Sequence, residues 1–360
     1  MAKMNKIALS AVVGLLLVGV IQGFQVPSNN LHIPRVSPLQ ATTVEPTSEK
    51  PQSVTDTLPY KIFDAMMNVP LFHDILFGVY RSQSVEKAEK MGIAWKQTLK
   101  ELDDADAELK QMQTDLTDPK LTIPDYYYAP IHAYADGNLC WDSAKEEDLW
   151  SKLMIAPLFN GRTDGDVKMR QNWIDNVDAV FKENKPRKVM DQGCGTGLSM
   201  YMCQQQWPEA DFLGVDMSTY KLAISEQKRR TLGALGDKVT LKHAPAEASG
   251  EAADQFDLVS ICLVNHESPL WVSKALFAEA YRTLKPGGLY TVLDLDKENL
   301  EILLTSPFVA AIYKQTEPYV QDFLALDMPE ALEECGFEVV RVVQASKSHK
   351  AIVARKPLDA

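Results

Sequence analysis

One stretch decides the fold of this chain: residues 189–197, which read Val-Met-Asp-Gln-Gly-Cys-Gly-Thr-Gly. A short apolar run leads there into three glycines at alternate positions, Gly193, Gly195 and Gly197. Glycine lets the backbone turn sharply and approach a ligand closely. The stretch therefore predicts a buried strand that turns into a helix, with a ligand held at the turn.

Apolar runs and helical patterns alternate after Lys185. Runs rich in Val, Ile and Leu cover residues 187–191, 211–216, 238–243, 256–263 and 288–294, and amphipathic stretches such as 218–232 and 271–284 separate most of them. This alternation predicts a parallel sheet with helices on both faces. Residues 337–343 and 350–355 are expected to form an antiparallel hairpin that closes the sheet.

The spacing of the glycines bears on the ligand. A dinucleotide site requires G-x-G-x-x-G, but Leu198 stands where the third glycine would be. Asp191 precedes the first glycine by two residues, and Asp216 ends the next strand, where a carboxylate can accept both ribose hydroxyls of a nucleoside. An acidic turn suits the α-amino group of S-adenosylmethionine, which has no pyrophosphate. The pattern therefore disfavours a dehydrogenase.

Four motifs in order resemble the class I S-adenosylmethionine-dependent methyltransferases, especially methyltransferase type 11 and the quinone-biosynthesis C-methyltransferases. After the glycine turn come Gly-Val-Asp-Met-Ser at 214–218, Phe-Asp-Leu-Val at 256–259 and Leu-Lys-Pro-Gly-Gly at 284–288. The resemblance spans Lys185 to the C-terminus. It implies an α/β fold with a doubly wound, seven-stranded, Rossmann-like sheet of order 3-2-1-4-5-7-6, and S-adenosylmethionine as the cofactor at the carboxyl ends of the strands.

The resemblance also implies the cofactor-binding residues, which are Asp191, Gly193, Gly195, Gly197, Asp216, Met217, Ala246, Glu247 and Leu263. One position departs from the family pattern. Many relatives carry Gly-Asp-Ala-Glu after the third strand, with the aspartate bonding the adenine amino group, whereas residues 244–247 here read Ala-Pro-Ala-Glu. That carboxylate contact is missing, and the backbone N–H of Ala246 is expected to meet the adenine ring instead.

The fourth apolar run leads into His266 and Glu267, which we expect at the carboxyl edge of the sheet, near the transferred methyl group. His266 is the first candidate for a general base because the ordinary pKa of histidine lies near neutrality. Glu267 is the second. The alternative is that His266 caps the next helix or packs beneath a lid.

An aromatic segment precedes the sheet domain and includes Tyr128, Tyr134 and Trp141. These three side chains are the candidates for an apolar acceptor pocket, and a packed joint between the two regions is the alternative. The five cysteines are widely spaced without a C-x-x-C pair, so no metal site is expected.

The N-terminal region has the features of a bipartite presequence. Lys3 and Lys6 precede an apolar run over 7–21, and the following residues contain Ser, Thr, Pro and Arg35 but no acid before Glu45. The junction at Phe24 resembles that of algae with complex plastids. We expect a signal peptide (1–23), a transit peptide and linker (24–58), a helical cap (59–184) and the methyltransferase domain (185–360). The expected location is the plastid; the secretory pathway is the alternative.

The net charge of −12 disfavours a nucleic-acid substrate, since such affinity rests on Lys and Arg. The expected function is methyl transfer to a small acceptor, such as a quinone, prenyl-lipid or tetrapyrrole. A protein methyltransferase, or a binding or assembly factor that keeps the fold, remains an alternative. Peripheral association with plastid membranes and the oligomeric state stay open.

Overall fold

The computed structural model describes residues 53–359. These residues form two compact units, one of 53–76 with 302–312 and a larger one of 77–301 with 313–359. The expected signal peptide, and the transit peptide and linker up to residue 52, lie outside the described residues.

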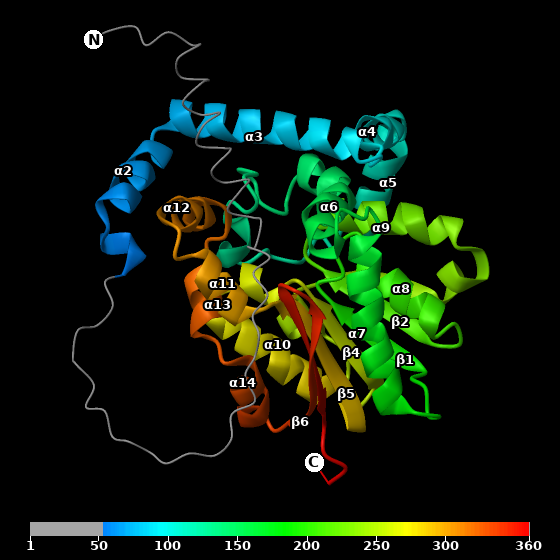
Figure 1. The fold of residues 1–360 in the computed structure, drawn as a ribbon. Coiled ribbons are helices and arrows are strands. Elements are labelled where there is room, and N and C mark those ends of the chain that lie inside the picture. Colours follow the sequence, from blue (N-terminus) through cyan, green and yellow to red (C-terminus); the bar gives the residue numbers. More distant parts are fainter. Residues whose placement is uncertain (1–52, 360) are drawn as a thin grey trace, which may run out of the picture. The chain divides into compact units, whose positions relative to one another are not determined.

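A seven-stranded sheet forms the centre of the larger unit (Figure 1), in the order β3-β2-β1-β4-β5-β7-β6. The neighbouring pairs from β3 to β5 are parallel, and β7 runs antiparallel to both β5 and β6. The expected doubly wound α/β fold is therefore confirmed. The strands are β1 (Lys188–Gln192), β2 (Asp211–Asp216), β3 (Val239–His243), β4 (Phe256–Cys262), β5 (Leu284–Leu295), β6 (Glu338–Ser346) and β7 (His349–Arg355).

Helices cover both faces of the sheet, as alternation along buried strands requires. On one face Val189 and Leu258 pack with residues of α7 (Gly165–Phe181) and α8 (Leu198–Gln206). On the other face Met190 and Val259 pack with α10 (Leu270–Thr283) and α14 (Met328–Glu334). Helix α7 belongs to the stretch expected to form a cap, but it covers the sheet instead, and the Trp173 indole donates to the hydroxyl of Thr291 over 2.7 Å.

The apolar spacing over residues 84–116 is typical of one long helix, but the structure divides this stretch. The chain forms α3 (Pro70–Lys90), α4 (Trp95–Asp104) and α5 (Asp106–Leu116), with Gly92 at a φ of 84° in the first break. A left-handed residue ends a helix even where the apolar spacing continues. The remaining helices of the described chain are α2 (Leu58–Met67), α6 (Trp141–Ile155), α9 (Thr219–Thr231), α11 (Lys297–Leu303), α12 (Pro307–Thr316) and α13 (Val320–Ala325), beside short 3₁₀ turns.

The smaller unit contains α2 and packs around aromatic rings. Phe63 meets Phe72 and Phe308 edge-on, with ring centroids 6.2 and 5.1 Å away. Among residues 53–359 no individual helix has both the length and the apolar composition to span a membrane; α2 and α3, which meet at a bend of 92°, satisfy those criteria only as a pair.

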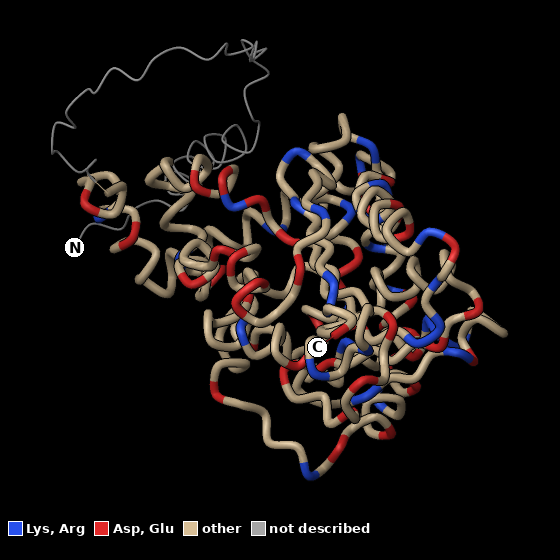
Figure 2. The backbone as a smooth tube through the Cα atoms, turned by 90° about the horizontal axis from the view of Figure 1, so that it is seen from below, with Lys and Arg blue, Asp and Glu red and all other residues tan. Residues whose placement is uncertain are grey.

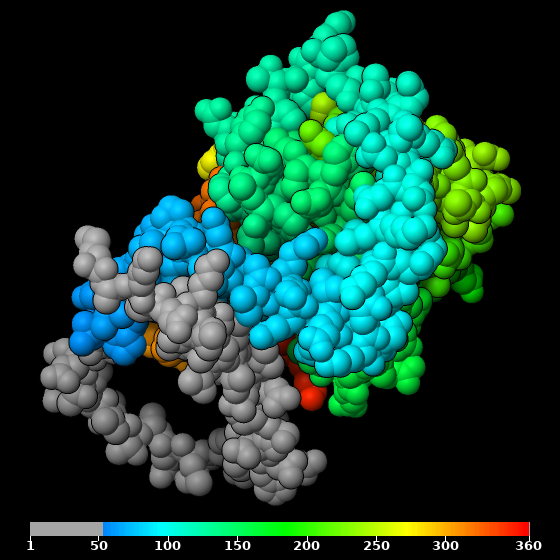
Figure 3. Space-filling view, turned by 90° about the horizontal axis from the view of Figure 1, so that it is seen from above, coloured from blue at the N-terminus to red at the C-terminus, as the bar shows by residue number. Residues whose placement is uncertain are grey.

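Charged positions of both signs are interspersed along the backbone of the larger unit (Figure 2). Seen from above, the segment from about residue 91 to 160 forms a continuous part of that unit's surface, drawn in cyan and green (Figure 3). This segment includes the aromatic residues that the sequence analysis singled out.

Candidate active site

The glycine turn joins β1 to α8 and admits no side chains at its key positions. Gly193, Gly195 and Gly197 have φ values of 67°, 52° and 82°, a left-handed region that disfavours other residues. A Cβ atom on Gly195 would lie 2.7 Å from Oε1 of Glu147. The turn therefore requires glycine both for its left-handed backbone and because neighbouring side chains leave no space for a Cβ atom.

Asp216, the last residue of β2, is buried and accepts backbone hydrogen bonds from residues at and near the turn. Its Oδ2 accepts the backbone N–H of Gly195 over 2.8 Å, and its Oδ1 accepts the N–H of Ser218 over 2.7 Å. The hydroxyl of Tyr127 donates to Oδ1 as well, over 3.2 Å. Burial raises the pKa of Asp216 above its ordinary value. The carboxylate therefore connects the turn to the aromatic segment.

Asp191 lies in β1, where it pairs in register with Ser260 of β4. Its carboxylate accepts the Ser260 hydroxyl over 2.6 Å, and burial raises the pKa of Asp191 to about 7. The side chain is 2% exposed.

Glu147 is a further carboxylate at the turn, and the sequence analysis missed it. It comes from α6 and accepts both the N–H and the hydroxyl of Thr196, over 3.2 and 3.0 Å. Lys221 forms an ion pair with it over 2.8 Å. Burial alone would raise the pKa of Glu147, but Lys221 and the Thr196 N–H outweigh burial and lower it. No motif marks this position, since an acid on a helix is ordinary.

The other expected cofactor residues lie near the carboxyl ends of the strands. The carbonyl of Ala246 accepts the Gln192 amide over 3.0 Å, and Met217 is buried directly after β2. Glu247 accepts the hydroxyl of Tyr126 over 2.6 Å. Leu263 has a φ of 58°. The structure thus brings these positions to one edge of the sheet, and their contact with a cofactor stays a prediction.

The aromatic segment contacts this edge through residues other than those expected. Tyr126 and Tyr127 reach the carboxylates of Glu247 and Asp216 from a 3₁₀ turn over Asp125–Tyr128. Tyr128, the next residue, is 58% exposed. The sequence shows that tyrosines gather here, but not which of them a 3₁₀ turn directs inward.

Tyr134 and Trp141 are placed at joints within the larger unit. The Tyr134 hydroxyl donates to Glu146 over 2.7 Å and accepts the Trp150 indole N–H over 3.0 Å. Trp141 packs edge-on against Tyr220, with ring centroids 5.2 Å apart. For Tyr134 and Trp141 the packing alternative describes these contacts, whereas Tyr128 is largely exposed.

His266 follows β4 at the expected edge and is buried. Its Nδ1 lies 2.7 Å from Oδ1 of Asp294, which also accepts the backbone N–H of Asn265 through Oδ2. Burial would lower the pKa of His266, but Asp294 and the nearby acids Glu267 and Glu317 outweigh it and raise the pKa to about 10. The raised pKa favours the protonated imidazole, whereas a general base has to be neutral, and the catalytic role of His266 stays a prediction.

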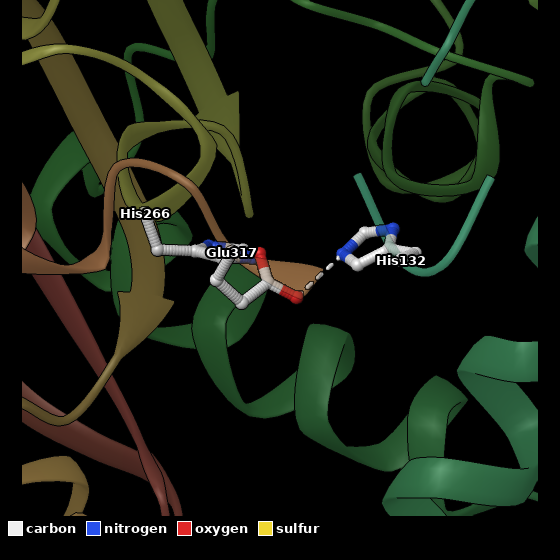
Figure 4. Close-up of side chains that lie close together, drawn as sticks. All are labelled: His132, His266 and Glu317. Carbon is white, nitrogen blue, oxygen red and sulfur yellow. Dashed lines mark ion pairs between the residues drawn. The ribbon is translucent and has the colours of Figure 1, made fainter. Parts of the chain in front are cut away.

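Three further groups surround this histidine, and Figure 4 shows two of them, His132 and Glu317, pointing toward it from separate parts of the chain. Nε2 of His132 lies 3.2 Å from Oε1 of Glu317 and 3.2 Å from Oε1 of Glu267. Glu267 is 3.7 Å from Nε2 of His266. The sequence analysis named His266 and Glu267 but missed His132 and Glu317, which lie far from them along the chain.

Comparison with known proteins finds similar methyltransferases. Residues 189–288 match a family model described as a methyltransferase domain. The chain is 32% identical over 129 residues to a demethylmenaquinone methyltransferase of Thermus thermophilus, covering 36% of this chain and 54% of that protein. It is 30% identical over 163 residues to a ubiquinone/menaquinone biosynthesis C-methyltransferase of Allorhizobium ampelinum, covering 44% and 58%.

The chain thus spans about half the length of these curated relatives. Among solved structures it is similar to an S-adenosylmethionine-dependent methyltransferase from Aquifex aeolicus, with a TM-score of 0.40 and 18% identity over 52% of this chain and 92% of the other.

The residues present fit the expected cofactor at two places. The turn carries close-packed glycines, and Asp216 and Glu147 supply acceptors for ribose hydroxyls and an amino group. The Tyr127 hydroxyl already donates to one oxygen of Asp216. A ribose hydroxyl would have to share that oxygen with Tyr127 or displace the Tyr127 hydroxyl.

Proposed function

We propose that this chain is an S-adenosylmethionine-dependent methyltransferase. The observation that carries the proposal is the hydrogen bond from the Gly195 N–H to Asp216. It fixes a carboxylate that can accept ribose hydroxyls beside a turn of three left-handed glycines. The match of residues 189–288 to a methyltransferase domain supports it. No purely structural role requires this combination of a crowded turn and a buried acid.

Each part of the site has a role in this proposal. Asp216 would accept the ribose hydroxyls, and the turn backbone with Glu147 would hold the methionine end. The cofactor supplies a methyl group on a positively charged sulfur. Glu147, whose pKa is lowered, supplies negative charge beside the turn, which favours binding of a cation. Methyl transfer then depends on alignment and on exclusion of water rather than on covalent catalysis.

For the acceptor we propose a small, apolar ring compound of the quinone type. The two curated relatives named above are methyltransferases of menaquinone and ubiquinone biosynthesis, although each matches over only about half its length. Tyr126, with Trp271 packed edge-on against it at 5.4 Å, offers aromatic surface beside the cofactor residues. Prenyl-lipids and tetrapyrroles are the other apolar acceptors that this proposal includes.

For the location we propose the plastid, reached through a bipartite presequence. The basic, apolar and acid-poor order of residues 1–43 and the position of Phe24 support it. Peripheral association with plastid membranes belongs to the same proposal.

Two measurements test the function. Calorimetric titration with S-adenosylhomocysteine should show one site per chain, and absence of binding would exclude the cofactor. Incubation with methyl-labelled S-adenosylmethionine and a plastid lipid and pigment extract should then transfer label to an organic-soluble product. Cofactor binding without labelled product, together with label on protein, would favour a protein methyltransferase. Binding with no label anywhere would favour a binding or assembly factor.

A further inference from the structure

Four side chains with metal-ligating chemistry converge beside the carboxyl end of β4. His266 and Glu267 come from the 3₁₀ turn after the strand. His132 comes from the segment between α5 and α6, and Glu317 directly follows α12. One ligand atom each from His132, His266 and Glu317 lie within 4.8 Å of one another. Figure 4 shows the two imidazole rings and the carboxylate of these three residues close together.

We propose that His132, His266 and Glu317, with Glu267 beside them, form a binding site for one divalent transition-metal ion. Two imidazole nitrogens with carboxylate oxygens match the ligand preference of Zn²⁺, whereas Mg²⁺ and Ca²⁺ prefer oxygen ligands alone. This inference concerns metal binding and does not rest on the proposed methyl transfer.

The surroundings of His266 support the proposal. Metal-binding histidines commonly present one ring nitrogen to the ion while the other nitrogen bonds a carboxylate. Here Nδ1 is 2.7 Å from Asp294, which leaves Nε2 directed to the cluster. Asp294 is itself held by the backbone N–H groups of Asn265 and Leu295, over 2.9 and 2.7 Å. The ring orientation is therefore set by β5 and does not depend on the other ligands.

Glu317 provides a second, independent observation. Its Oε1 pairs with His132, but its Oε2 is buried and has no hydrogen-bond partner. A buried carboxylate oxygen without a partner is costly, and a cation is one group that satisfies it. Glu317 is held next to His132 because the His132 N–H donates to the carbonyl of Thr316 over 2.8 Å.

The backbone at His132 also indicates a constrained position. His132 and Ala133 have φ values of 54° and 66°, both left-handed and both unfavourable for residues with a Cβ. Such strain persists where surrounding structure enforces it, often at functional sites. Ligand atoms lie about 3.4 Å apart around a tetrahedral ion with bonds of about 2.1 Å. The cluster therefore has to contract modestly, and His132, whose side chain is 41% exposed, has room to move.

The test is a titration of the chelator-treated, purified chain with Zn²⁺, followed by calorimetry. We expect one ion per chain, and affinity weaker by about tenfold or more in His132→Ala, His266→Ala and Glu317→Gln. His73→Ala is the matched control, since His73 lies outside the cluster, and it should bind as the parent does. Circular dichroism checks the folding of each variant. Substitution with Co²⁺ should add visible absorption bands that His132→Ala loses.

His132→Ala is the decisive variant, because its partly exposed side chain is not part of the core. Absence of saturable Zn²⁺ binding to the parent chain would overturn the proposal. So would binding that stays unchanged in both His132→Ala and Glu317→Gln, because the ion would then sit elsewhere on the surface. Neither result would bear on S-adenosylhomocysteine binding, which is measured separately.

Discussion

The phenol of Tyr127 donates a hydrogen bond to Oδ1 of Asp216 over 3.2 Å, although the two residues are 89 positions apart in the chain. The same carboxylate accepts the backbone N–H groups of Gly195 and Ser218. A carboxylate offers about four lone-pair positions, so three are taken and two ribose hydroxyls cannot both be accepted without a change. Tyr127 is the partner that can leave, because the two N–H groups belong to the folded turn.

Tyr127→Phe should therefore strengthen the binding of S-adenosylhomocysteine. The change removes a competing hydroxyl and keeps the ring, so we expect about threefold to tenfold higher affinity by calorimetry. Tyr128→Phe is the control, since that side chain is largely exposed and should leave affinity unchanged. Weaker binding in Tyr127→Phe would show that the hydroxyl helps to hold the cofactor.

Asp216→Ala should have the opposite effect. It removes the acceptor for two hydroxyls, and each bond to a charged group contributes about 1.5–3 kcal/mol. We expect at least about a hundredfold loss of S-adenosylhomocysteine affinity. Asp211→Ala, at the exposed start of the same strand, is the control. Equal affinity in the two variants would remove Asp216 from the site.

Gly195→Ala separates backbone strain from crowding. Gly195 and Gly233 have nearly the same φ, 52° and 55°, but a Cβ on Gly233 meets nothing within 4 Å, whereas one on Gly195 lies 2.7 Å from Glu147. Both variants should lose about 1–2 kcal/mol of unfolding free energy from strain. Only Gly195→Ala should also lose cofactor binding. If Gly233→Ala loses binding to the same degree, the effect is not local to the turn.

His266 makes a pH-dependent contribution to stability. Its pKa is raised to about 10 by Asp294 and the nearby Glu267 and Glu317, which outweigh burial. In the unfolded chain the pKa of histidine is about 6.5. Since the folded state holds the proton more tightly, the stabilisation is complete below about pH 6.5 and is lost as the pH rises through about 10.

Denaturant unfolding in the presence of a chelator measures the contribution of His266 to stability at each pH. The free energy of unfolding should fall by on the order of a few kcal/mol between about pH 7 and pH 10, and His266→Gln should flatten the decline. His349→Gln is the control, because burial lowers the pKa of His349 to about 4 and keeps it neutral throughout. An undiminished slope in His266→Gln would assign the decline to other groups.

Residues 1–58 should direct a fluorescent protein to the plastid. Replacing Phe24 with Ala in that fusion should leave it outside the inner plastid membranes, because the transit peptide is expected to begin with this residue. Fluorescence microscopy distinguishes the outcomes. Secretion of the unaltered fusion would refute the plastid location and favour the secretory pathway.

The sheet was predictable because its determinants are local. Strand boundaries differ from the expected runs by a few residues, as for β1, which covers Lys188–Gln192 rather than 187–191. The larger shift is in β5, which begins at Leu284. Its register with β4 slips between the Phe256–Leu284 and Leu258–Leu289 pairs, so the Pro-Gly-Gly segment lies inside the strand. Apolar periodicity does not reveal such a slip.

The site was only partly predictable, for a reason of distance along the chain. Gly193, Asp216 and His266 sit beside strands, where a pattern predicts both the element and its edge. Glu147 lies on α6 and Glu317 directly follows α12, both without a motif, and they reach the site only through the tertiary fold. In the aromatic segment, a 3₁₀ turn decides that Tyr127 and not Tyr128 faces inward.

By itself, then, the sequence determined the alternation of strands and helices and the position of the glycine turn, because both follow from local spacing and from the φ values that favour glycine. The strand order came from the resemblance to the methyltransferase family. The tertiary structure decided the chemical state of the groups around that turn. His266 is an ordinary histidine in the sequence, and its pKa is raised because Asp294 and Glu317, from two other places in the chain, converge on it beside the adjacent Glu267. Electrostatic fields add up over distance in space, which the order of residues does not record.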